Sequence, residues 1–170
     1  MIRDLKNLIV KDIHEMTGLT VVDTDNPRKK PPYPFYTLKF TSIQRDKVEE
    51  GNLYEDFVDS TDDRFTYDVL YTLARQPKAI ISFNCLSNDI LEAQDYIMKA
   101  WDYFKFYGYE SLKASNFVVV NVMDIQDRTV FDGVNYEYRQ GFDVETRFLH
   151  TMDKRIENIE TYKIRRGEDY

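Results

Sequence analysis

The sequence of 170 residues is poor in the residue types from which most catalytic and metal sites are built. It has one cysteine, Cys85, and two histidines, His14 and His150, which lie far apart in the chain. A lone thiol forms no disulfide within the chain, which favours a reducing compartment. The six glycines are scattered, so the sequence has no glycine-rich loop for a phosphate group. These absences argue against an enzyme.

The few candidates for chemistry have simpler interpretations. His14 precedes Glu15, but the two-histidine pattern of a zinc protease is missing. Cys85 alternates within an apolar run, which predicts a buried and inert thiol. Asp89, Glu92 and Asp95 suggest a metal site, yet a capped helix start accounts for them equally. The sequence predicts no catalytic, cofactor-binding or metal-binding residue, and we expect no cofactor.

Basic residues are also in deficit, with 23 against 30 acidic residues and a net charge of -7. This balance excludes nucleic-acid binding by a general attraction to phosphates, although a local basic patch is compatible with it. No apolar run is long enough to cross a bilayer, and the first residues lack the apolar stretch of a signal peptide. We therefore expect synthesis in the cytoplasm and no contact with a membrane.

Aromatic residues, in contrast, are abundant, with 13 tyrosines and 11 phenylalanines. Tyrosine favours strands and interfaces, where an apolar ring meets water. The clearest pattern lies in residues 142–148, where apolar or aromatic side chains at every second position alternate with Asp143, Glu145 and Arg147. This period of two predicts a strand with one buried face and one charged face.

Apolar spacing of three and four predicts helices over residues 2–16 and 90–104. Gly18 and Gly108 are the expected ends, and residues 87–89 offer N-caps for the second helix. Strands are predicted over residues 19–22, 35–43, 65–73 and 78–86, and in two runs between 117 and 148. Gln76 and Pro77 suggest a break or a hairpin turn.

The remaining segments lack a clear period. Residues 23–34 are rich in proline and predict an extended connection. Residues 45–64 are the most acidic part, and we predict a mobile loop with at most one short helical turn. Residues 152–170 predict a short helix or a last strand, with a disordered end at 165–170. The order of elements predicts an α+β fold, a single domain over 1–170, with a mostly antiparallel sheet flanked by helices on one face.

Two groups of residues are candidates for contacts with a partner. Arg28, Lys29 and Lys30 lie between prolines in a stiff basic arm, which is either a surface connection or an arm that lies on an acidic neighbour. A ligand for a proline-recognising domain is a further alternative. Arg128 and Arg139, with Phe142 and Asp143, lie near strand ends. There an arginine either contacts a carboxylate across an interface or forms an ion pair within the chain.

Several segments together resemble the tail terminator proteins of long-tailed bacteriophages, the family of phage neck terminator proteins. The segments are residues 32–37 (PYPFYT), 81–83 (ISF), 89–93, 101–104, 117–120 (FVVV) with Asp127 and Arg128, 136–144 (YEYRQGFDV) and 156–160. They span most of the chain. The acidic residues 45–64 match no part of the pattern and read as an insertion.

The resemblance implies a structural virion protein and not an enzyme. Such proteins form a hexameric ring on the last ring of the tail tube, stop tube growth and face the head-side connector, while DNA passes through the lumen without specific binding. The implied partners are copies of itself, the tail tube protein and the connector or stopper protein, in the virion neck. The alternatives are another connector or stopper, a tail tube protein and, more remotely, a small cytoplasmic ligand-binding protein or enzyme.

Overall fold

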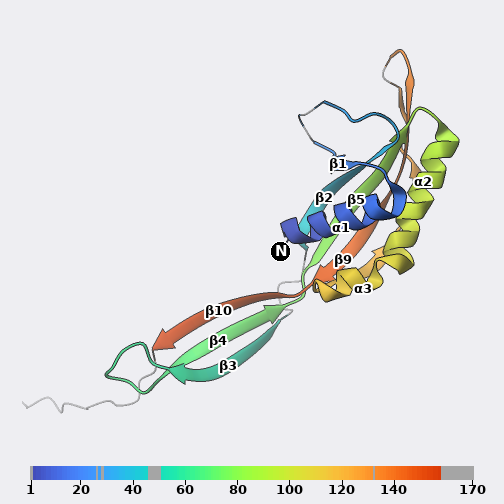
Figure 1. The fold of residues 1–170 in the computed structure, drawn as a ribbon. Helices are drawn as coiled ribbons and strands as arrows, with labels where there is room; N and C mark the ends of the chain where they lie inside the picture. Colours follow the sequence, from blue (N-terminus) through green and yellow to red (C-terminus); the bar gives the residue numbers. More distant parts are fainter. Residues whose placement is uncertain (1, 26, 28, 46–50, 132, 158–170) are drawn as a thin grey trace, which may run out of the picture. The chain divides into compact units, whose positions relative to one another are not determined.

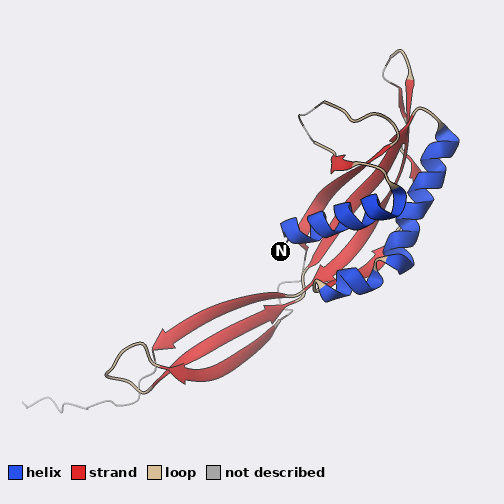
Figure 2. Cartoon of the chain, in the orientation of Figure 1, coloured by secondary structure: helices blue, strands red, loops and turns tan. Residues whose placement is uncertain are grey.

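The computed structural model describes residues 2–25, 27, 29–45, 51–131 and 133–157 (Figure 1). The chain forms two compact units, unit 1 from residues 1–47 and 77–149 and unit 2 from residues 48–76 and 150–170. Both contain β-sheet, and the helices of the described residues all belong to unit 1 (Figure 2). The α+β prediction is confirmed, whereas one domain over 1–170 stays a prediction. No helix in the described part is long and apolar enough to span a membrane.

Unit 1 is built on a seven-stranded sheet. Its main path runs β1 (Val21–Asp23), β2 (Phe35–Arg45), β5 (Lys78–Ser87), β9 (Tyr136–Phe148) and β6 (Phe117–Val122). The short strands β7 (Gln126–Asp127) and β8 (Val130–Phe131) pair with the first half of β9. Only the pairing of β1 with β2 is parallel, so the predicted mostly antiparallel sheet is confirmed.

The helices pack on one face of this sheet (Figure 1). They are α1 (Ile2–Thr17), α2 (Ile90–Asp102), the π-helix η1 (Tyr103–Tyr107) and α3 (Tyr109–Ala114). The core between helices and sheet comes from apolar positions at helical spacing and from every second strand residue; its members include Leu5, Ile9, Ile13, Tyr36, Leu38, Ile81, Phe83, Ile97, Phe104, Phe142, Val144 and Phe148. The predicted alternation in residues 142–148 therefore lies with its apolar side towards the helices.

The predicted helix ends are confirmed at three positions. Gly18 adopts a φ of +75°, and its N–H donates to the His14 carbonyl at 2.8 Å. The Asp89 carboxylate caps α2 by accepting from the Leu91 N–H at 2.9 Å. Gly108 ends η1, which directly follows α2, and its N–H donates to the Tyr103 carbonyl at 2.8 Å; α3 begins at the next residue. A Cβ on Gly108 would lie 2.5 Å from the Tyr103 ring, so this glycine also permits close packing.

Unit 2 is an antiparallel three-stranded sheet in the order β10 (His150–Glu157), β4 (Tyr67–Arg75), β3 (Asn52–Asp59). The loop predicted over residues 45–64 is therefore wrong for β3. The strand was not predicted because its acidic residues are typical of a loop. They are tolerated in β3 because almost all of this strand is exposed. Of the two alternatives for the last segment, the strand is confirmed as β10, while the expected disorder at 165–170 lies outside the described residues.

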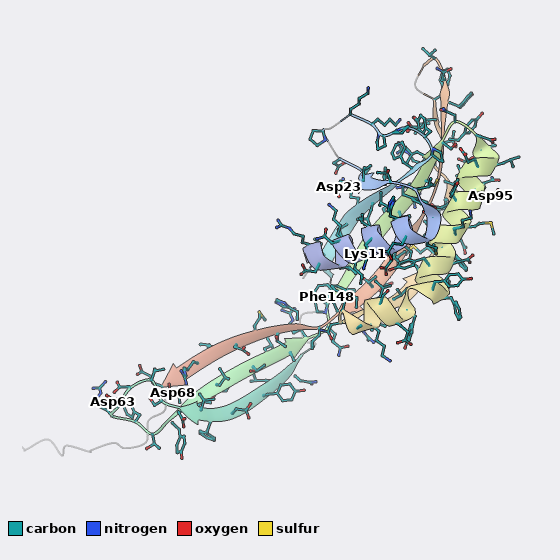
Figure 3. All side chains as sticks on the ribbon, viewed as in Figure 1. Lys11, Asp23, Asp63, Asp68, Asp95 and Phe148 are labelled. Carbon is teal, nitrogen blue, oxygen red and sulfur yellow. The ribbon has the colours of Figure 1, made fainter. Side chains whose placement is uncertain are left out.

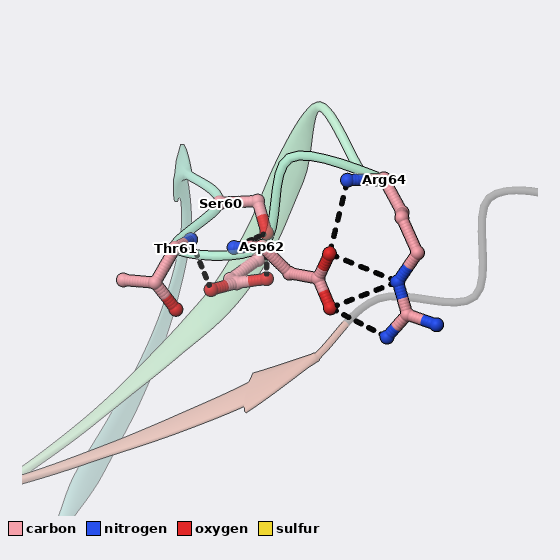
Figure 4. Close-up of polar contacts among 5 residues, drawn as sticks. Ser60, Thr61, Asp62 and Arg64 are labelled. Atoms are coloured by element: carbon pink, nitrogen blue, oxygen red, sulfur yellow. Dashed lines mark hydrogen bonds and ion pairs between the residues drawn. The ribbon is translucent and has the colours of Figure 1, made fainter.

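The turn between β3 and β4 is held by carboxylates (Figure 4). Asp62 accepts from the Arg64 side chain, at 3.0 and 3.2 Å from Nε and 2.6 Å from Nη2, and also from the Arg64 N–H at 3.0 Å. These bonds lower the pKa of Asp62 to about 2. Asp68, which is 1% exposed, accepts from the Ser60 hydroxyl at 2.9 Å and pairs with Arg155 at 3.1 Å.

Candidate interface on the helix-free face of the sheet

The face of the seven-stranded sheet opposite the helices is mostly polar, although Phe35, Ile80 and Leu86 also lie on it. Strand register places Ser82 beside Asp143, and Lys78 beside Arg147. Further polar residues of β2, β5 and β9 share this face: Thr37, Lys39, Asn84, Arg139 and Glu145. Lys78 pairs with Glu145 at 2.6 Å. A sheet face with this composition suits contact with water or with the polar surface of a partner.

Arg128 lies on this face and bonds three side chains of its own chain. Its guanidinium donates to Ser82 Oγ at 2.8 Å, to Asn84 Oδ1 at 2.9 Å and to Asp143 Oδ1 at 3.1 Å. This is the ion pair within the chain that was one of the two alternatives. The bonds tie the segment after β7 to β5 and β9, so Arg128 and Asp143 order this face from within.

Gly141 makes room for this arrangement. A Cβ at residue 141 would lie 2.1 Å from Asn84 Oδ1 and 2.9 Å from the Phe83 carbonyl oxygen. The glycine therefore leaves room for Asn84 Oδ1, which accepts from Arg128, while Asn84 Nδ2 donates to Thr37 on β2. Here a glycine is required for close approach, and its own φ is unremarkable.

Glu137 connects the basic arm to the same face, and the sequence reasoning missed it. Its side chain is 15% exposed and pairs with Lys30 and with Arg139, the latter at 2.8 Å. It also accepts from the Tyr33 hydroxyl. The signal was present in the sequence, because residues 137 and 139 lie two apart on one strand and so share a face. Lys30 therefore contacts an acid of its own chain, as a surface connection would.

A pocket of about 250 Å³ lies beneath the arm. Lys29, Lys30 and Arg139 contribute cations to its lining, and Asp23 and Glu137 contribute carboxylates. Arg139 Nε is buried and has no hydrogen-bond partner among the described residues. The structure thus brings together Lys29, Lys30 and Arg139, which were predicted separately; Arg28, the third predicted cation of the arm, lies outside the described residues.

Phe142 is a correction to the predicted interface residues. Its side chain is 0% exposed, and its ring lies 5.9 Å from the rings of both Phe83 and Phe104. Because neighbouring strand residues point to opposite faces, Phe142 lies in the core while Asp143 lies on the polar face. Phe142 offers no surface to a partner.

Three residues considered for catalysis or metal binding are buried or form hydrogen bonds within the chain: Cys85, His14 and Glu92. Cys85 is buried, as predicted, and burial raises the pKa of its thiol to about 12, with the nearby Glu92 adding to the shift. The exposed His14 ring bonds the Leu19 carbonyl at 2.9 Å. Glu92 accepts from the Ser87 hydroxyl at the start of α2. Within the described ranges no three acidic, histidine or cysteine side chains gather as metal ligands would.

A second hollow of about 670 Å³ lies between the helices. It is wide open, and its lining includes Asp12, Lys99, Asp102 and Tyr107. Asp12 accepts from the Tyr103 hydroxyl at 2.8 Å and the Ser111 hydroxyl at 2.7 Å. These bonds join α1 to η1 and α3, so Asp12 serves helix packing.

Comparison with known proteins gives one finding. A family model described as phage neck terminator protein matches residues 2–168 of this chain. No curated protein matches it.

Proposed function

This chain belongs to the family of phage neck terminator proteins, and from this premise we propose that it forms a ring which caps the phage tail tube, ends tube growth and joins the tail to the head. The family is one of structural proteins of the phage neck. The observation that carries the proposal is the extent of the match, which includes both units and all described residues.

The partners proposed are copies of the chain itself, in a ring of six, with the tail tube protein on one side and the connector or stopper protein on the other. A specific ring contact buries about 1,000 Å² or more of protein surface. DNA passes through the lumen without specific binding. The net charge of -7 supports this part, because an acidic wall repels phosphates and keeps DNA from adhering.

Within this ring we propose that the polar face and the basic arm meet a neighbouring copy. The residues concerned are Arg128, Arg139, Asp143, Lys29 and Lys30, with Arg28 beside them in the sequence. Arg139 is the most informative of these, because its guanidinium is 31% exposed, pairs with Glu137 and lines the pocket beneath the arm. The exposed part of the guanidinium is where a carboxylate or carbonyl group from a neighbour would bind.

Reversing the charge of Arg139 should abolish ring assembly and leave the monomer folded. Arg139→Glu places a second acid beside Glu137 and removes the donor that a neighbour would meet. Arg3→Glu is the matched control, since it makes the same charge change at an exposed position of α1, on the opposite side of the sheet from the polar face, and it should assemble as the unchanged protein does. Native mass measures assembly, and circular dichroism measures folding. If Arg139→Glu unfolds the chain, Arg139 belongs to the fold and not to the interface.

The capping activity is tested with the tail tube protein of the same phage. Adding the chain to growing tubes should shorten them, with the mean length falling as the ratio of chain to tube protein rises. Tubes should carry the chain at one end only. Unchanged tube lengths would contradict the capping proposal. If the chain alone grew into long tubes, it would be a tube protein instead.

A further inference from the structure

The sheet of unit 2 has almost no core of its own. Of the residues in β3, β4 and β10, only Asp68 is buried, and side chains project from both faces (Figure 3). A three-stranded sheet needs a packed apolar face or other cover to be stable in water. Within the described residues the sheet has no such cover, so its side chains are open to contact with a partner.

One face of this sheet is apolar. Strand register places Leu53, Leu73 and Met152 in one row, and Phe57, Val69 and Ile156 in another. Phe57 is 71% exposed and Leu53 is 59% exposed. The two rows flank a third, in which Glu55 on β3 and Lys154 on β10 lie on either side of Tyr71. An exposed apolar group of this kind marks an interaction surface.

The two edges of the sheet carry opposite charges at the same level. Glu55 and Asp56 lie on the β3 edge, opposite Tyr71 and Leu70 of the central strand. Lys154 and Arg155 lie on the β10 edge, opposite the same two residues. The edges are two strand spacings apart, roughly 10 Å, and Tyr71 lies between them. Within the described residues Glu55 and Lys154 form no ion pair with each other.

This pattern differs from the usual protection of sheet edges. Proteins prevent pairing between exposed edge strands by placing like charges on them, which repel each other when two copies approach. Here β3 of one copy presents acids where β10 of another presents bases. The acids of β10, Asp153 and Glu157, lie level with the uncharged Tyr54 and Val58 of β3. The charges therefore favour a contact between unlike edges of two copies.

We propose that β3 of one copy pairs edge to edge with β10 of the next copy around the ring. This inference rests on the proposed function, because a ring gives every copy two neighbours. Pairing of like edges around a two-fold axis would oppose acids to acids, whereas unlike edges make the head-to-tail contact from which closed rings are built. Both edge strands run antiparallel to β4, so copies that point the same way around a ring axis pair in parallel.

The test uses two single charge reversals, Glu55→Lys and Lys154→Glu. Arg155 is left unchanged because it pairs with the buried Asp68. In the first variant both edges are basic at this level, and in the second both are acidic. Each variant alone should raise the concentration needed for half-assembly about tenfold, because every contact in the ring becomes repulsive. A 1:1 mixture should restore assembly, since alternating copies oppose unlike charges at each contact.

Glu110→Lys is the control, because it makes the same charge change at an exposed position of α3 in unit 1. It should assemble as the unchanged protein does. Native mass and circular dichroism follow assembly and folding of each variant. The inference is overturned if either edge variant assembles normally, if a mixture of folded variants stays unassembled, or if the mixture yields only dimers. If the unchanged protein gives no ring even at a tube tip, the proposed function itself fails, and this inference falls with it.

Discussion

At the scale of single residues, the two faces of β9 have different roles. Phe142 points into the core against Phe83 and Phe104, while its neighbour Asp143 points out and binds Arg128. Of these two adjacent residues, Phe142 stabilises the core and Asp143 holds Arg128 in place on the polar face. A substitution in this strand acts through whichever face it touches.

Phe142→Ala should lower the free energy of unfolding by about 3–5 kcal/mol, because it removes a fully buried ring and leaves a cavity. Phe142→Leu keeps most of the apolar volume and should cost less than about 1.5 kcal/mol. Urea unfolding followed by circular dichroism measures both. Equal stability of the alanine variant and the unchanged protein would show that Phe142 is not a core residue.

The faces of β9 could be predicted from alternation, but the partners of its side chains could not. The sequence placed Asp143 on a charged face, yet the bonds of Arg128 to Ser82 and Asn84 need strands that lie some 40 residues away in the chain. The role of Gly141 could not be predicted either, because it makes room for the Asn84 amide of the neighbouring strand. Phe142 was predicted as an interface residue, although the same alternation places it inside.

At the scale of elements, the turn between β3 and β4 is the best-defined local motif of unit 2. Asp62 binds the Arg64 side chain and N–H, and these bonds hold the pKa of Asp62 at about 2, below its ordinary value of 3.8. A carboxyl group whose pKa is lower in the folded state stabilises that state above its ordinary pKa. That contribution is lost as the pH falls through about 2.

Nuclear magnetic resonance of the Asp62 carboxyl carbon should therefore give a titration midpoint near 2 in the folded chain. Arg64→Ala should return the midpoint towards 3.8, because it removes the charged donor. Arg147→Ala, which removes an exposed arginine from unit 1, should leave the midpoint unchanged. An unchanged midpoint in Arg64→Ala would contradict the role given to this pair.

Most elements of unit 1 could be predicted, since their apolar periods reflect a real core. β3 could not, because a strand that buries almost nothing leaves no apolar period and its acids resemble those of a loop. Gly108 ends η1 as predicted, but the packing of the Tyr103 ring against it could not be predicted from the sequence. Prediction from pattern works where burial shapes the sequence and fails where it does not.

At the scale of the whole molecule, the neck assignment came from a resemblance and not from a site. Short segments spread over residues 32–160 indicated the family, and the family match over residues 2–168 confirms it. The division into two units was not predicted, because unit 2 is assembled from two separate stretches of the chain. Nothing in the periodicity of either stretch shows that they meet.

The central claim is that this chain closes into a ring. The most direct measurement is the native mass of the purified protein over a concentration series, with negative-stain electron microscopy of the same samples and of samples given tail tube tips. The account predicts closed rings of one size and a mass six times that of the chain, either free or at tube tips. A chain that stays monomeric in solution and leaves tube tips bare would contradict it.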